Sequence, residues 1–154
     1  MTIIQHNLDA LIKDLIDSQK RIVTILTAYA DRQDWRSKEG EWSLREVAAH
    51  LATAERECFL DRIQRISSGE NPDLAYYQDT GRDFGDVDLI ESLEKWQATR
   101  HEIIMLIRSL PDSAWKLTGN HAHRGPIDVA DVLRITLEHD VEHLIVLKQD
   151  LNHF

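Results

Sequence analysis

Two histidines four residues apart, His139 and His143, have a spacing that suits a metal ion. On an α-helix, residues four apart lie on the same face with Cβ atoms about 5–6 Å apart. Neutral imidazoles in that arrangement can converge on one divalent ion, with metal–nitrogen distances of about 2.0–2.1 Å. A third histidine, His50, falls on the otherwise apolar face of another expected helix, so the three residues form a candidate metal site.

Each of these histidines also has a structural interpretation. A single histidine on an apolar face is more often a hydrogen-bonded core residue than a ligand. However, burying three imidazoles requires a partner for every ring nitrogen. One shared metal satisfies three of these nitrogens together, which favours the metal site. The alternative, in which the histidines are structural and no metal binds, stays open.

Apolar residues at helical spacing predict four long helices that position these side chains. The third and fourth helices have Asp88 and Asp128 as expected N-caps. There is no strand alternation and no internal repeat. The sequence therefore predicts an all-α fold, a four-helix bundle in a single domain over residues 1–154. The expected helices cover residues 3–30, 44–67, 89–110 and 129–151.

The start of the second helix carries the clearest local signal. Ser43 and Glu46 match a capping box, in which each side chain accepts a hydrogen bond from the other residue's backbone N–H. Trp42 and Val47 occupy the two positions of a hydrophobic staple. This pattern predicts that the helix begins at Leu44, and it makes capping the expected role of Glu46.

The depth of the histidines along their helices bears on topology. His50 lies roughly 10 Å from the N-terminal end of the second helix, and His143 and His139 lie roughly 12 and 18 Å from the C-terminal end of the fourth. These levels match better if the two helices are antiparallel. We therefore expect an up-down-down-up order, in which the connection over residues 68–87 crosses to start the third helix at the same end as the second. This connection exceeds the usual length of about 2–8 residues, so it either crosses the bundle or forms part of a site.

The composition excludes several classes of partner. A formal net charge of −9 argues against nucleic acid and against anionic membranes, which both require clustered basic residues. No segment has the length and hydrophobicity of a membrane span, and the N-terminus has no signal-peptide pattern. The single cysteine, Cys58, fits a reducing compartment and is expected to be a small buried apolar residue. We expect a cytoplasmic protein.

Two segments form a recognisable pattern, namely Trp42-Ser43-x-x-Glu46-Val47-x-x-His50-Leu51 and His139-Asp140-x-Glu142-His143. Together they resemble the DinB/YfiT-like superfamily of metalloenzymes. The segment 119–125 before the last helix also resembles the pattern of this family. The resemblance spans nearly the whole chain. It implies a four-helix bundle with up-down-down-up order and a partly open site. The implied ligands of zinc, nickel or a similar divalent ion are His50, His139 and His143.

The same resemblance leaves the reaction open. Some relatives resemble hydrolases and others resemble transferases that use a low-molecular-weight thiol such as bacillithiol, mycothiol or glutathione. Many relatives form dimers, so a homodimer is an expectation here. We expect either metal-dependent hydrolysis or thiol transfer on a small-molecule substrate. The alternative is a non-catalytic metal-binding or stress-related bundle.

Three further residues are candidates for a substrate pocket. Arg100 lies in an otherwise apolar helical stripe, where it would bind an anionic substrate or pair with a carboxylate of the bundle. His121 lies in the polar segment before the last helix, and either contacts the site or belongs to an ordinary loop. Tyr76 lies in the long connection 68–87. Asp140 points off the expected metal face, so we expect a surface charge or a partner for another helix.

Overall fold

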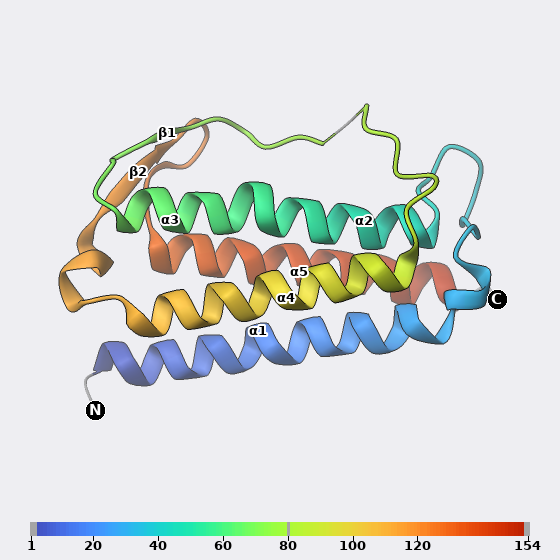
Figure 1. The fold of residues 1–154 in the computed structure, drawn as a ribbon, viewed down its shortest axis with the longest axis horizontal. Helices are drawn as coiled ribbons and strands as arrows, with labels where there is room; N and C mark the ends of the chain where they lie inside the picture. The colour runs from blue at the N-terminus through green and yellow to red at the C-terminus, as the bar shows by residue number, and fades with distance from the viewer. Residues whose placement is uncertain (1–2, 80, 153–154) are drawn as a thin grey trace.

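Four long helices form the body of the chain in this computed structural model, which describes residues 3–79 and 81–152. In Figure 1, α1 and α5 run from left to right, whereas α2, α3 and α4 run from right to left. Helix α2 packs mainly against α4, and α1 against α5. The helices are α1 (Ile3–Ala28), α2 (Leu44–Ala54) with its continuation α3 (Asp61–Ser67), α4 (Leu89–Ser109) and α5 (Val129–Leu151).

The predicted helix starts are confirmed. The Ser43 hydroxyl accepts from the Glu46 N–H at 3.3 Å, and the Glu46 carboxylate accepts from the Ser43 N–H at 3.2 Å. Asp88 caps α4, and Asp128 caps α5 in a second reciprocal box with Asp131. Because these contacts span only three residues, the local sequence is sufficient to specify them.

The helix expected over residues 44–67 is not a single α-helix. Residues Glu55–Leu60 form a π-helical segment, η2, between α2 and α3. A π-turn holds an additional residue, so it rotates the chain relative to a regular α-helix. Within this segment Glu55 is 1% exposed, whereas Glu57 lies at the surface. Apolar residues at helical spacing continue on both sides of η2, and for this reason the sequence pattern did not reveal it.

A small three-stranded sheet corrects the expectation of a purely helical fold. Strand β1 (Asp73–Leu74) pairs in parallel with β2 (Thr118–His121), which pairs antiparallel with β3 (Gly125–Asp128). A Cβ atom at Gly119 would lie 3.1 Å from the Pro72 carbonyl oxygen, so a glycine permits the close approach. Strands of two to four residues containing glycine and proline carry no readable alternation, which explains why they were expected to be loops.

The connection after α3 runs beside α2 and α3 before it reaches the start of α4 (Figure 1). We call residues 68–88 the connecting segment. Its first part contributes β1 to the sheet, and the Ala75 carbonyl accepts a hydrogen bond from Arg62 of α3 at 2.7 Å. At the other end, Arg45 of α2 donates to the Val87 carbonyl at 2.9 Å. Both ends of the connecting segment are therefore held against the α2–α3 helix.

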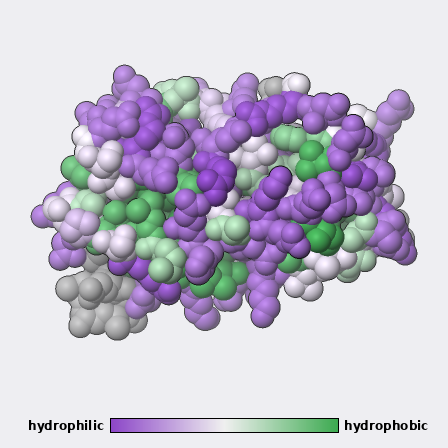
Figure 2. Space-filling model, in the orientation of Figure 1, coloured by the Kyte–Doolittle hydropathy of each residue, from purple (hydrophilic) through white to green (hydrophobic). Residues whose placement is uncertain are grey.

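Two apolar clusters make up the core. One includes Ile12, Ile63 and Ile103, and the other includes Ile22, Leu51 and Trp96. Hydrophilic residues cover most of the face seen in Figure 2, with hydrophobic residues visible between them. No helix in the described part of the chain combines the length and apolar character that crossing a membrane requires.

A buried charged network lies between the two clusters. Its members are one residue from each of α1, η2, α4 and α5, namely Ser18, Glu55, Arg100 and Asp140. The Arg100 guanidinium donates to Glu55 at 2.9 Å, to Asp140 at 2.8 and 3.0 Å, and to the Leu15 carbonyl at 2.7 Å. With a further bond from its Nε to Glu55, all the N–H groups of the guanidinium are satisfied.

This network favours the charged form of Arg100. Burial alone would lower the pKa of Arg100, but the carboxylates of Glu55 and Asp140 raise it above its ordinary value. Ser18 also donates to Asp140, and the Trp96 indole donates to Glu55 at 3.2 Å. Because each partner comes from a different helix, the network fixes the relative register of all four.

Replacing Arg100 with methionine is expected to destabilise the fold severely. The Arg100→Met variant leaves two carboxylates buried without a counter-charge, which costs about 3–5 kcal/mol. Urea unfolding followed by circular dichroism measures the loss. The matched control is Arg56→Met, which breaks an ion pair with Glu102 between side chains that are 56% and 47% exposed, and should cost about 1 kcal/mol or less. Equal losses in both variants would contradict the assigned role of the network.

Candidate metal centre

The structure brings His50, His139 and His143 together. His50 comes from the second turn of α2, and the other two come from successive turns of the antiparallel helix α5. Their ligand atoms all lie within 4.8 Å of one another. The Nε2 atom of His139 is 3.0 Å from that of His50 and 3.2 Å from that of His143. The three candidate ligands recognised in the sequence thus form one cluster.

These separations fit a metal ion. With metal–nitrogen bonds of about 2.0–2.1 Å, two ligating nitrogens lie about 2.9 Å apart at a right angle and about 3.3 Å apart at a tetrahedral angle. The observed 3.0 and 3.2 Å lie between these values. Both separations from His139 therefore fit ligands of one divalent ion, and the donor set also suits such an ion chemically, since imidazole binds zinc and nickel alike.

The protonation states of His139 and His143 favour the binding of a cation. Burial, reinforced by the neighbouring histidines, lowers the pKa of His139 to about 3. Burial and the proximity of His50 lower the pKa of His143 to about 4. Both imidazoles are consequently neutral at pH 7, which is the form that binds a metal.

Asp79 fixes the orientation of the third imidazole. Its Oδ2 atom lies 2.6 Å from Nδ1 of His50, and Asp79 is 6% exposed. A carboxylate accepts, so Nδ1 of His50 must carry the proton, and the lone pair of Nε2 is directed towards the other two histidines. A carboxylate behind a ligating histidine is a common feature of metal sites. Asp79 lies in the connecting segment, and no local pattern distinguished it from the other acidic residues there.

Aromatic rings border two of the histidines. The ring of Trp42 lies 4.6 Å from that of His50, and the ring of Phe59 lies 5.4 Å from that of His139, measured between centroids. Trp42 was expected to act in a hydrophobic staple with Val47, a pattern that did not predict its contact with His50. Trp42 remains 38% exposed, so it lies at the border between the cluster and solvent.

The structure assigns Arg100 to the buried network. At 1% exposure it is inaccessible to a substrate, which corrects its placement in a substrate pocket. The alternative expectation, pairing with a carboxylate of the bundle, describes its contacts with Glu55 and Asp140. Asp140 is accordingly a cross-helix partner. Cys58 is 5% exposed, and burial raises the pKa of its thiol to about 11, so it is the buried apolar residue that we expected.

His121 and Tyr76 lie with His123 at the small sheet. Nδ1 of His121 accepts from the backbone N–H groups of His123 and Arg124 at 3.1 and 3.2 Å, so this ring closes the β2–β3 turn. Burial, with nearby Arg62 contributing, lowers the pKa of His121. Tyr76 is 62% exposed, and its ring lies 5.5 Å from that of His123. These contacts join His121 and Tyr76 to the sheet, whereas the metal ligands come from α2 and α5.

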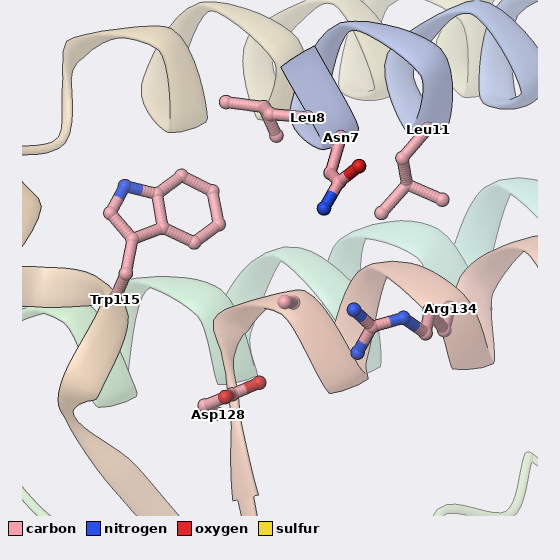
Figure 3. A pocket seen from close by; sticks show the side chains of 7 residues that line it. Asn7, Leu8, Leu11, Trp115, Asp128 and Arg134 are labelled. Carbon is pink, nitrogen blue, oxygen red and sulfur yellow. The ribbon is translucent and has the colours of Figure 1, made fainter. Parts of the chain in front are cut away.

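A separate pocket of about 220 Å³ lies where the N-terminal part of α1 meets the start of α5. Leu8, Trp115 and Arg134 face it (Figure 3). Trp115 comes from the short 3-10 helix Asp112–Lys116 between α4 and β2. None of the three clustered histidines is among its lining residues, so this pocket is distinct from the candidate metal centre.

The fold and the cluster define a helical bundle with a candidate three-histidine metal centre, and comparison with known proteins identifies the family. The model of the DinB superfamily matches residues 5–147, so the chain belongs to the DinB superfamily. Among solved structures, it is similar to YfiT from Bacillus subtilis, with a TM-score of 0.81 and 21% identity. The match covers 99% of this chain and 89% of YfiT. A search of curated proteins found no match.

YfiT is described as a probable metal-dependent hydrolase with an unusual four-helix bundle topology. At this level of identity the similarity establishes a shared fold. The four-helix bundle expected from the sequence is confirmed by the structure and by this neighbour. The chemistry of this chain depends on its own residues.

Removing the charge of Asp79 is expected to weaken metal binding. The Asp79→Asn variant keeps the shape of the side chain but loses the carboxylate that orients His50, so affinity for zinc should fall about 10- to 100-fold. Competition with a chromophoric chelator measures the dissociation constant. Asp86→Asn is the control, because Asp86 is an exposed acidic residue of the same connecting segment. Unchanged affinity in Asp79→Asn would show that Asp79 does not support the metal.

Proposed function

We propose that this chain is a metal-dependent hydrolase of small molecules, with a divalent ion held by His50, His139 and His143. The observation that carries this proposal is the convergence of the three imidazoles within 4.8 Å. Membership of the DinB superfamily supports it, as does the description of the structural neighbour YfiT as a probable metal-dependent hydrolase. Zinc and nickel are the ions that we propose, because both accept three imidazoles.

The residues around the cluster indicate how the site would work. A divalent ion with three protein ligands and an open position supplies Lewis acidity and an activated water for hydrolysis. Asp79 holds the His50 ring in place, with its proton on Nδ1. Trp42 and Phe59 border the imidazoles with apolar surface. We therefore propose that the substrate carries an apolar group beside the bond to be cleaved.

Elemental analysis of tag-free protein tests the metal site. We expect close to one metal ion per chain in the parent protein and a sharp loss in both His50→Ala and His143→Ala, which remove ligands from different helices. His101→Ala is the control, since His101 is an exposed histidine of α4 and should leave the metal content unchanged. A parent protein that stays metal-free after incubation with zinc and nickel would refute the proposed centre and favour a structural role for the histidines.

Assays with activated esters and amides test the reaction. We expect turnover by the metal-loaded parent protein, and a decrease of at least about 100-fold in kcat/KM for His143→Ala, because the open coordination position is lost with the metal. Addition of a chelator should abolish turnover, and addition of zinc or nickel should restore it. Conjugation of glutathione or another low-molecular-weight thiol without hydrolysis would identify a transferase instead. Full metal occupancy without either reaction would identify a non-catalytic binding protein.

A further inference from the structure

We infer that Glu57 is a positioning residue of the metal centre: it holds the connecting segment on both sides of Asp79 and thereby keeps the Asp79 carboxylate against His50. This inference rests on the proposed metal site and extends it to a residue of the π-helical segment. Glu57 lies seven positions after His50, about 10 Å further along the helix axis. It therefore acts through the connecting segment, without contact with the ion.

Glu57 binds two residues that flank Asp79. Arg82 donates from Nη1 to Oε1 of Glu57 at 2.8 Å and from Nη2 to Oε2 at 2.6 Å. The Tyr77 hydroxyl donates to the same Oε2 at 3.2 Å. A bidentate guanidinium–carboxylate pair fixes both distance and orientation. Because Tyr77 precedes Asp79 by two residues and Arg82 follows it by three, Glu57 restrains the backbone on both sides of Asp79.

A backbone hydrogen bond links Arg82 directly to Asp79. The Arg82 N–H donates to the Asp79 carbonyl at 3.3 Å. Gly81, directly before Arg82, has a φ of +88°, a conformation that glycine adopts without steric cost. Fixing the Arg82 side chain on Glu57 therefore also restrains the backbone of Asp79. Asp79 and Arg82 behave as one unit held at two points, His50 and Glu57.

The protonation states of Glu57 and Tyr77 favour these hydrogen bonds. The hydrogen bonds from Arg82 outweigh burial and hold the pKa of Glu57 below its ordinary value, so Glu57 is ionised at pH 7. Burial, with a contribution from Glu57, raises the pKa of Tyr77, so its hydroxyl keeps the proton that it donates. Glu57 and Arg82 are 42% and 46% exposed, and pairs this exposed contribute little to global stability. Loss of Glu57 should therefore affect the position of Asp79 more than the stability of the fold.

Because Glu57 lies in η2, one helical segment makes two separate sets of contacts. Glu55 points into the bundle and binds Arg100, whereas Glu57, two residues later, binds the connecting segment at the surface. The same π-helical segment thus holds the buried charge of Arg100 and the segment that carries Asp79. Neither contact involves a metal ligand.

The test compares zinc affinity in the parent protein, Glu57→Gln, Asp79→Asn and the double variant. We expect Glu57→Gln to weaken zinc binding about 3- to 10-fold, less than Asp79→Asn, because it removes a support of Asp79 rather than Asp79 itself. In the Asp79→Asn background the same substitution should have no further effect, since its action passes through Asp79. Glu102→Gln is the matched control, because it weakens a comparable exposed ion pair, with Arg56, that joins η2 to α4 and not to the connecting segment.

A second readout does not depend on the metal. In the apo-protein, Glu57→Gln should increase amide hydrogen exchange in residues 77–88 at least about 3-fold, while Glu102→Gln should not. Unchanged zinc affinity together with unchanged amide exchange in Glu57→Gln would overturn the inference. It would also be overturned if Glu57→Gln weakened zinc binding equally in the parent protein and in the Asp79→Asn variant. A parent protein that binds no zinc would refute the proposed centre separately, and the exchange measurement would then decide the role of Glu57.

Discussion

The buried positive charge of Arg100 is the constraint on which the rest of the bundle depends. A guanidinium at 1% exposure must have acceptors for all of its N–H groups and carboxylates for its charge. The acceptors come from α1, η2 and α5, so the helices pack in the one register that satisfies them. Asp140 is one of these partners, and the adjacent His139 consequently has a fixed place in the candidate metal centre.

The candidate metal centre lies next to the buried charged network and depends on it indirectly. Two of its ligands come from α5, which Arg100 anchors through Asp140, and the third comes from α2, which leads into the π-helical segment that holds Glu55. Asp79 adds a support from outside the helices. A site built from three segments with separate anchors can keep its imidazoles in place before any ion binds, which reduces the cost of ordering them.

Membership of the DinB superfamily bears on the fold, whereas the individual residues bear on the chemistry of the site. The family match and the similarity to YfiT establish the fold. The donor set, the neutral imidazoles and the apolar rings of Trp42 and Phe59 indicate what this chain could bind. A fold hosts many reactions, so the choice of hydrolysis depends on the site.

The sequence by itself determined the features that depend on near neighbours: the caps at Ser43, Asp88 and Asp128, the long helices, and the pairing of His139 with His143 on one face. Depth along the helices also associated His50 with that pair. Only the tertiary structure decided the partners of Arg100, the support of His50 by Asp79, and the short sheet. The ion pairs of Arg100 with Glu55 and Asp140 and the contact of His50 with Asp79 join residues 29 to 45 positions apart in the chain, and these contacts arise from packing rather than from local conformational preference. An acidic residue looks the same in the sequence whether it faces solvent or, like Asp79 and Glu55, a buried partner.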